Sequence, residues 1–365
     1  MGISREQVLA YRFHAQQLDR TAGHDLTDAA ILDLGVQDTG TDGGLWALAN
    51  RGVAATELEE PGDLVLAWTL RGAPHFYRRA DVSGVAAATA PFSEADAAKR
   101  VLNAAKPLRA AGISPLQALD VVAGHLREIV TSPTVKGDLS TTLTRRLPDP
   151  YLRFCGPCDA IHSYEMPFRL AALRAGLELE PGTSPPVLRR VPRWRGLAKE
   201  VPERLDVVRG YLHLLGPATP QLVAGFLDAP VKEVQAHWPE DTVDVEVAGE
   251  PRSLLEADVQ PCERATIDPG AVRLLGPHDL FLQARDRDVL VPDPKRQKQL
   301  WVVLGSPGAV VAGGEVVGTW RPRASGARLR LAVDLWTPVA EGLITEQAER
   351  LAAHRGGAFA GFTDR

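Results

Sequence analysis

The residues best able to do chemistry in this chain lie at positions 35–39, where Gln37, Asp38 and Thr39 place a carboxamide, a carboxylate and a hydroxyl side by side. Such groups can hold, orient or deprotonate a water molecule. Asp38 and Thr39 are also common turn and helix-capping residues, so a capped loop without chemistry is the plain alternative. The choice between these two interpretations depends on the elements that surround the bend.

The sequence around the bend predicts a winged helix, a fold that usually binds DNA. Two short helix-like segments, Asp25–Leu34 and Asp42–Arg51, flank the bend. A predicted hairpin follows, with strands Leu64–Leu70 and Pro74–Arg79 and a turn at Arg71-Gly72. Polar groups in such a module favour water-handling chemistry on nucleic acid.

A clearer pattern of the same kind lies further along the chain. Glu203–Leu214 carries leucine and valine at helical spacing, and a Gly-Pro break leads to a second helix, Pro220–Leu227, with proline at its first position. A third helix, Pro230–Trp238, precedes two alternating strands, Thr242–Val247 and Arg252–Leu255. We therefore expect a helix-turn-helix followed by a wing.

A weaker copy lies between these two modules. Helices are expected at Pro115–Val130 and Leu139–Leu147, joined by a turn at Lys136-Gly137-Asp138, with a further helix at Glu165–Ala175. Short strands are expected on either side of that last helix, at Leu152–Phe154 and Leu177–Leu179. The unit that carries the bend, the weaker copy and the clearer pattern together indicate tandem winged helices and not a regular solenoid.

The rest of the chain differs in character. Pro181–Pro202 is rich in proline and arginine and is predicted to be a linker. Ala271–Pro338 predicts a small antiparallel sheet or barrel with a hairpin turn at Gly313-Gly314, and Ala340–His354 predicts a closing helix. The strands of this sheet are expected at Leu280–Gln283, Trp301–Leu304, Ala309–Ala312, Glu315–Trp320 and Arg328–Leu335.

The fold class expected is α+β, with three tandem winged-helix modules around a C-terminal antiparallel β-barrel. Four segments follow in order: 1–90 with the bend, 91–185, 186–262 with the basic linker, and 263–365 with the barrel and closing helix. The length of 365 residues and the hydrophobic fraction of 45% are sufficient for several cores.

Composition restricts the class of protein. Three cysteines are too few for a secreted disulfide scaffold, and the sequence shows neither a signal peptide nor a run of membrane-spanning length. A cytoplasmic protein is expected. The net charge of −5 argues mildly against a protein that coats nucleic acid through its positive charge. Local basic clusters on an acidic protein nevertheless suit an enzyme that binds DNA transiently. Acidic residues gather elsewhere, at Glu57, Glu59, Glu60 and Asp63.

Candidate DNA contacts come from the hairpin, from a helix and from the linker. Phosphate contacts in DNA complexes are made largely by arginine and lysine, although solvated surface is the commoner explanation of any one cluster. Arg71 could equally be turn surface, and His75 could equally be a packed residue. The candidates are Arg71, His75, Arg145, Arg146, Arg189, Arg190, Arg193 and Arg195.

Cys155, Cys158 and His162 have spacing that could hold a metal ion. A structural zinc site nearly always shows four ligands, and Cys262 is the remaining cysteine. We expect no metal here, with the cysteines packed at a turn and His162 hydrogen-bonded to the backbone. A thioredoxin-type redox role lacks its usual helix context.

Taken together, these motifs resemble the winged-helix DNA glycosylases of the AlkZ and YcaQ type. The resemblance spans essentially the whole chain, and the order of the motifs is more specific than any one of them. Its carriers are the bend at 35–39, the hairpin at 68–75, residues 155–162 leading into 168–171, residues 279–282 with 285–287, and residues 317–320.

The resemblance implies three winged helices around a barrel that form a channel for double-stranded DNA. It implies excision of alkylated bases, including bulky adducts and crosslinks made by genotoxic natural products, as in antibiotic self-resistance. It implies no cofactor and no membrane partner, and we expect a monomer. No lysine lies near the bend to form a Schiff base, so a monofunctional enzyme is expected.

The catalytic motif of this family is Gln-x-Gln, or Gln-x-Asp in the YcaQ branch. Gln37 matches its first position, whereas Thr39 stands where glutamine or aspartate is expected. Side chains of neighbouring residues diverge in a sharp bend, so Gln37 and Thr39 are expected to share a face. Gln37 is the first candidate for holding water, Asp38 the second and Thr39 the third. A non-catalytic DNA-binding regulator, or an enzyme relic, is the alternative.

Overall fold

The chain folds into two compact units in the computed structural model, which describes residues 2–40, 43–53, 62–325 and 327–363. The first unit comprises Met1–Leu58, Arg209–Val223 and Pro239–Arg365, and the second comprises Glu59–Val208 and Ala224–Trp238. The four segments expected from sequence are each continuous along the chain, whereas each compact unit combines stretches that are far apart in sequence. The predicted helix start at Asp42 and the acidic residues Glu57, Glu59 and Glu60 lie outside the described residues.

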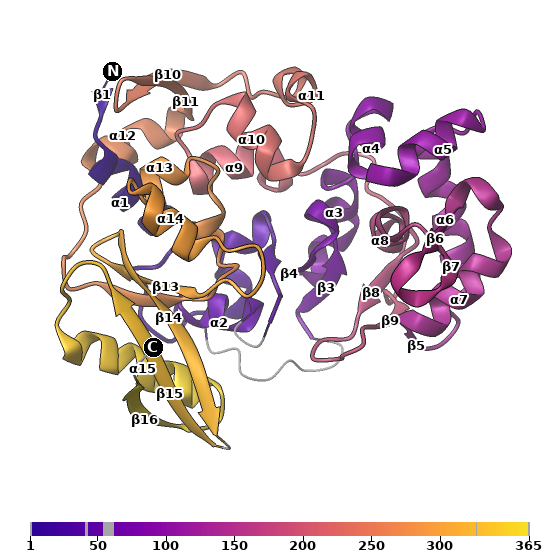
Figure 1. The fold of residues 1–365 in the computed structure, drawn as a ribbon. Coiled ribbons are helices and arrows are strands. Elements are labelled where there is room, and N and C mark those ends of the chain that lie inside the picture. The colour runs from indigo at the N-terminus through magenta and orange to yellow at the C-terminus, as the bar shows by residue number, and fades with distance from the viewer. Residues whose placement is uncertain (1, 41–42, 54–61, 326, 364–365) are drawn as a thin grey trace. The chain divides into compact units, whose positions relative to one another are not determined.

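Helices from both ends of the chain belong to the first unit (Figure 1). Helix α1 begins with a capping box, because Ser4 Oγ accepts from Gln7 N and the Gln7 side chain accepts from Ser4 N. The helices of this unit are α1 (Arg5–Ala15), α2 (Gly44–Ala49), α12 (Glu256–Arg264), α13 (Arg287–Leu290), α14 (Pro294–Leu300) and α15 (Glu341–His354). The strands are β1 (Gly2–Ile3), β2 (Val36–Gln37), β10 (Thr242–Val247), β11 (Glu250–Leu255), β12 (Val272–Leu275), β13 (Gly308–Ala312), β14 (Glu315–Ser325), β15 (Arg328–Leu335) and β16 (Ala358–Thr363).

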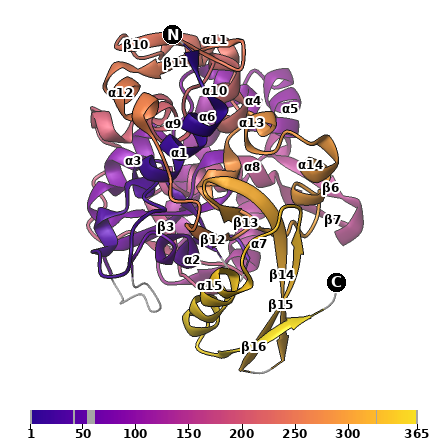
Figure 2. The ribbon, with the colours of Figure 1, turned by 90° about the vertical axis from the view of Figure 1, so that its left-hand side faces the viewer.

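The C-terminal sheet is open and five-stranded, in the order β12-β13-β14-β15-β16. Helix α15 runs alongside it in Figure 2, and Ile344 and Leu351 of this helix join Leu274 and Leu331 of the sheet in one buried cluster. No pairing within the described part of the chain joins β12 to β16, so the expected closed barrel is wrong. The Gly313-Gly314 hairpin turn between β13 and β14 is confirmed.

The second unit contains the remaining helices and two sheets. The predicted hairpin is present as β3 and β4, which pair antiparallel with Leu64 opposite Arg78 and Trp68 opposite Pro74. The helices are α3 (Val82–Ala88), α4 (Glu94–Arg100), α5 (Ala105–Ala110), α6 (Pro115–Ile129), α7 (Lys136–Arg146), α8 (Glu165–Arg174) and α11 (Val231–Ala236). The strands are β3 (Leu64–Trp68), β4 (Pro74–Arg78), β5 (Thr134–Val135), β6 (Leu152–Cys155), β7 (Ala160–Ser163), β8 (Leu177–Leu179) and β9 (Val187–Arg190).

Helices α9 (Val207–Leu215) and α10 (Pro220–Leu227) each contribute residues to both units. Together with α11 and the β10–β11 hairpin they reproduce the clearest predicted pattern, with α10 and β10 at the expected bounds. Proline at the first position of α10 fixes its start, because its missing N–H has no partner at a helix N-terminus. No helix within the described ranges is long and apolar enough to cross a membrane.

Several expected elements differ from the structure. Asp25–Leu34 forms two 3-10 turns, Leu26–Asp28 and Ala30–Asp33, in place of a helix. Residues 136–138 are the first turn of α7 and not a loop. Leu280–Gln283 is a 3-10 turn whose apolar residues are buried, and 301–304 is irregular. Short apolar runs are compatible with a buried strand or a buried turn, which explains these errors.

The predicted linker is also partly a strand. Val187–Arg190 forms β9, which pairs antiparallel with both β8 and β5. Its leucine, Leu188, is fully buried, and the next residue, Arg189, pairs with the buried Glu178 of β8. The prolines on either side of this segment led to the prediction of a linker, although the segment is an interior strand of the sheet.

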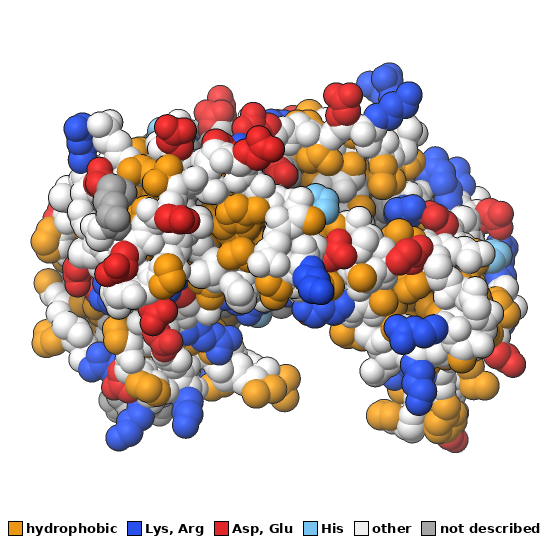
Figure 3. All heavy atoms as spheres, turned by 90° about the horizontal axis from the view of Figure 1, so that it is seen from above, with side chains coloured by type: hydrophobic (Ala, Val, Ile, Leu, Met, Phe, Trp, Pro, Cys, Tyr) orange, Lys and Arg blue, Asp and Glu red, His pale blue; other side chains and the backbone are white. Residues whose placement is uncertain are grey.

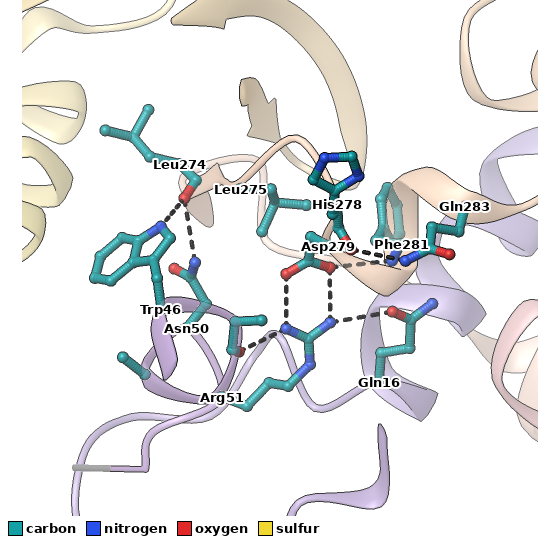
Figure 4. A network of polar contacts seen from close by, with 12 residues as sticks. Gln16, Trp46, Asn50, Arg51, Leu274, Leu275, His278, Asp279, Phe281 and Gln283 are labelled. Carbon is teal, nitrogen blue, oxygen red and sulfur yellow. Dashed lines mark hydrogen bonds and ion pairs between the residues drawn. The ribbon is translucent and has the colours of Figure 1, made fainter. Parts of the chain in front are cut away.

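A buried ion pair connects α2 to the start of the C-terminal region within the first unit (Figure 4). Arg51 donates through Nη1 and Nη2 to Asp279 Oδ2 and Oδ1, both at 2.9 Å, and both side chains are fully buried. Arg51 also donates to Ala47 O and to Gln16 Oε1. Trp46 Nε1 donates to Leu274 O at 2.7 Å. These bonds fix the C-terminal end of α2.

Breaking this pair should destabilise the protein strongly. We expect Arg51→Met to lower the free energy of unfolding by about 3–5 kcal/mol, because it leaves the Asp279 carboxylate buried without its partner. Urea denaturation at neutral pH measures the change. The double variant Arg51→Met with Asp279→Leu removes both charges and should recover at least half of that loss. A single variant within about 1 kcal/mol of the parent protein would contradict the prediction.

Candidate active site

The bend places Gln37 and Thr39 on a common face, as expected. Strand β2 ends at Gln37, whose Nε2 donates to Thr39 Oγ1 at 3.1 Å. This bond fixes the amide group so that Gln37 Oε1 points away from Thr39. Oε1 makes no hydrogen bond to the described part of the chain and is therefore an acceptor available to water.

Asp38 turns the other way and holds the start of helix α2. Its Oδ1 accepts from Gly44 N at 2.9 Å, which satisfies an amide that has no partner inside the helix. Burial raises the pKa of Asp38, and the hydrogen bond from Gly44 opposes that rise. The carboxylate is therefore a stronger base than an exposed aspartate, but one of its oxygens is already engaged.

Gly43 makes this arrangement possible. A Cβ at position 43 would lie 2.4 Å from Asp38 Oδ1 and 3.0 Å from Thr39 N. The first distance is shorter than Cβ atoms adopt in folded proteins, and the second is tighter than most Cβ contacts. No sequence pattern around the bend indicated this requirement, because the contact depends on how the chain returns past Asp38.

A pocket of ≈ 270 Å³ adjoins the bend within the first unit. Thr39 and Gly40 line one part of it, and Trp320, Arg321 and Arg323 of β14 line another. Arg321 Nη1 donates to Gly305 O at 2.7 Å, which holds its guanidinium in place. Two guanidinium groups beside the bend suit a phosphate, and no lysine is among the described residues that line this pocket. Arginines recur in the sequence at positions 321, 323, 328 and 330, but no local pattern indicates that the first two lie beside the bend.

The two hairpin candidates are engaged inside the second unit. His75 is almost fully buried, and its Nδ1 lies 3.1 Å from Thr69 Oγ1 and 2.9 Å from Ala73 O. The Arg71 guanidinium lies 4.7 Å from the ring centre of Phe226 and donates to its carbonyl oxygen. The geometry gives both residues packing roles and offers no support for their DNA contacts.

The remaining arginine candidates fall into two groups. Three have protein partners: Arg146 pairs with Glu128, Arg189 pairs with the buried Glu178, and Arg190 donates to the carbonyls of Val130 and Arg127. On the face drawn in Figure 3, basic side chains are interspersed with acidic ones and form no continuous field.

The second group is Arg145 on α7 and Arg193 and Arg195 after β9, all of which are exposed. None of them makes a hydrogen bond or an ion pair with residues in the described ranges. Arg193 lies in the left-handed region of the backbone, with φ 55°. Of the predicted phosphate contacts, these three are the ones without a partner among the described residues.

Comparison with known proteins defines the class. The family model described as "DNA glycosylase AlkZ-like" matches residues 31–359. The chain therefore belongs to the AlkZ-like family of DNA glycosylases, enzymes that hydrolyse the bond between a base and its sugar. Among solved structures, the Streptomyces sahachiroi DNA glycosylase AlkZ has the same fold, with a TM-score of 0.73 and 18% sequence identity, and the match covers 100% of both chains. No curated protein matches the chain in sequence.

Adding a methyl group at position 43 tests whether the bend must keep this geometry. We expect Gly43→Ala to reduce glycosylase activity at least about 10-fold, because its Cβ would displace Asp38 or Thr39 from Gln37. Single-turnover base release measures the effect.

Gly342→Ala is the matched control, because a Cβ at Gly342 in α15 would meet nothing within 4 Å. This control should keep full activity and gain slightly in stability, by about 0.5–1 kcal/mol. Equal activity in the two variants would show that the bend tolerates movement of Asp38.

Proposed function

We propose that this protein is a monofunctional DNA repair glycosylase that removes purines alkylated at N7 or N3, with Gln37 positioning the attacking water. Membership of the AlkZ-like family supports the reaction class. The observation that carries the assignment of Gln37 is its bond to Thr39, which leaves Oε1 as the acceptor available for water.

Cleavage of the N-glycosidic bond to an alkylated base requires little general-acid catalysis. Alkylation at N7 or N3 makes the base cationic, so the electron pair of the breaking C1′–N bond neutralises the departing base. The water oxygen then bonds to C1′, and the proton of that water passes to solvent or to a nearby base. The protein must hold the water and stabilise the positive charge that develops on the sugar.

Each residue of the bend has a distinct part in this scheme. Gln37 Oε1 accepts from the water and orients it, and Thr39 fixes the Gln37 amide. The Thr39 hydroxyl thereby replaces the second carboxamide or carboxylate of the family's motif as a positioning group. Asp38 holds α2 through Oδ1, and Oδ2 is the group by which it would accept the proton. No lysine lines the described pocket, which supports a hydrolytic enzyme without a lyase step.

In this proposal, DNA binding depends on arginines that have no acidic partner among the described residues. We infer phosphate contacts for Arg145, Arg193 and Arg195, which are exposed in the second unit. The pocket beside the bend adds Arg321 and Arg323 in the first unit. A protein with a net charge of −5 must rely on such local groups to bind a polyanion.

Base release from defined lesions tests this function. Duplex DNA carrying N7-methylguanine, and DNA treated with a bulky alkylating agent, are incubated with the protein and then with alkali, which cleaves abasic sites. We expect strand breaks with at least one of these substrates. Gln37→Ala should slow single-turnover release by about 100-fold or more while DNA binding stays within about 2-fold, because only the orientation of the water is lost.

Gln260→Ala provides the matched control, because Gln260 is an exposed glutamine on α12. It should leave release unchanged. DNA binding without strand breaks on either substrate would favour the non-catalytic regulator instead. Full activity of Gln37→Ala would place the catalytic centre elsewhere.

The salt dependence of binding tests the arginine assignment. We expect the double variant Arg193→Ala with Arg195→Ala to reduce the slope of log K against log salt concentration by about 2, because each lost phosphate contact removes about 0.9. Fluorescence anisotropy with an undamaged duplex gives the slope. Arg109→Ala, an exposed arginine on α5 outside the proposed contacts, should leave the slope unchanged. Equal slopes for both variants would exclude residues 193 and 195 from the interface.

A further inference from the structure

The β6–β7 hairpin carries a cluster of soft ligands that the proposed glycosylase reaction does not use. The Sγ atoms of Cys155 and Cys158 and a ring nitrogen of His162 all lie within 4.8 Å of one another. Cys155 and Cys158 are free thiols, the first half-buried and the second exposed. The cysteines lie at a turn, as expected, but Cys158 is exposed and not packed, and His162 makes no hydrogen bond to the described residues.

The backbone of the hairpin tip brings the two thiols together. Gly156–Cys158 forms a single 3-10 turn, and Asp159 follows it in the left-handed region with φ 47°. Both thiols thus project from one tight turn, and His162 joins them from the opposite strand, where it pairs with Arg153.

We propose that Cys155, Cys158 and His162 bind one zinc ion, with the fourth coordination position open to water. Two thiolates and an imidazole form a soft donor set that selects zinc over magnesium or calcium. Bonds of about 2.3 Å to sulfur at the tetrahedral angle would place the two sulfurs about 3.8 Å apart. Side-chain rotations that move the ligand atoms by about an ångström would bring the three ligands to that spacing.

The requirement for four protein ligands, which argued against zinc in the sequence, does not apply to an exposed site. Cys262 is fully buried in the first unit and does not belong to the cluster. Zinc sites with three protein ligands keep water at the fourth position, and the exposed hairpin tip gives water free access. Binding releases one proton from each thiol and none from the neutral imidazole, which leaves a site without net charge.

The metal would stabilise the outer half of the hairpin. Its base is anchored, because Ser163 N donates to Thr144 Oγ1 on α7 at 3.0 Å. Its outer half exposes the cross-strand pair Phe154 and Ile161, which are 65% and 59% exposed. An isolated two-stranded hairpin is marginally stable in water. Zinc at the tip would hold this apolar pair in one position on the surface.

Cobalt substitution of the full-length protein tests the site. The protein is reduced, freed of metal with a chelator and titrated with Co²⁺ and then with Zn²⁺. We expect one equivalent of Co²⁺ to give the absorption of a tetrahedral thiolate complex, which Zn²⁺ then abolishes. Cys155→Ser with Cys158→Ser should eliminate the signal, whereas Cys262→Ser should retain it. Uptake equal in the double variant and the parent protein would overturn the proposal.

Two further measurements test the ligand set and its consequence. His162→Ala should weaken Zn²⁺ binding at least about 10-fold, and unchanged affinity would overturn the three-ligand assignment. Amide hydrogen exchange of the peptide spanning 152–163 should slow on addition of Zn²⁺. A reduced protein that takes up neither metal, and that forms a Cys155–Cys158 disulfide in air, would overturn the zinc site. These outcomes do not depend on glycosylase activity.

Discussion

The buried pair of Arg51 and Asp279 is the constraint on which the candidate site depends. Two charges removed from water destabilise a fold unless their geometry compensates for the lost hydration. Here Nη1 and Nη2 of Arg51 engage both carboxylate oxygens and also donate to Ala47 O and Gln16 Oε1, whereas the buried Nε makes no hydrogen bond to the described residues. The two residues are 228 positions apart, so the pair holds the end of α2 against the segment that leads into the C-terminal sheet.

The position of α2 in turn determines the position of the bend. The helix is short and begins at Gly44, whose amide is held by Asp38, so the bend and the helix behave as one element. Trp46 in the same helix enters the core of the C-terminal sheet. Gln37 and Thr39 are therefore connected to rigid structure through Asp38, so the aspartate beside the proposed catalytic residue has a structural role. Such support is what a site that positions a water molecule requires.

The sequence predicts the elements whose signals are local. Proline at the first position of α10, the alternation of β10 and the glycine pair before β14 each place an element correctly. At the bend, the divergence of neighbouring side chains places Gln37 and Thr39 on one face. Contacts distant in sequence carry no such signal. The dependence on Gly43, the neighbourhood of Arg321 and the burial of His75 follow from segments that meet only when the chain is folded.

Arginine clusters show why the pattern of charge alone is a weak guide to DNA binding. Arg189 lies in a run of basic residues, yet its charge is compensated by Glu178, a buried carboxylate that also pairs with Arg79. A buried carboxylate needs such partners, so these arginines stabilise the fold and their charges are not available to a ligand. The exposed Arg193 and Arg195 lie only a few residues further along but beyond the end of β9, where no strand pairing positions an acidic neighbour. In a chain whose net charge is −5, the cations available to DNA are those that the fold itself does not use.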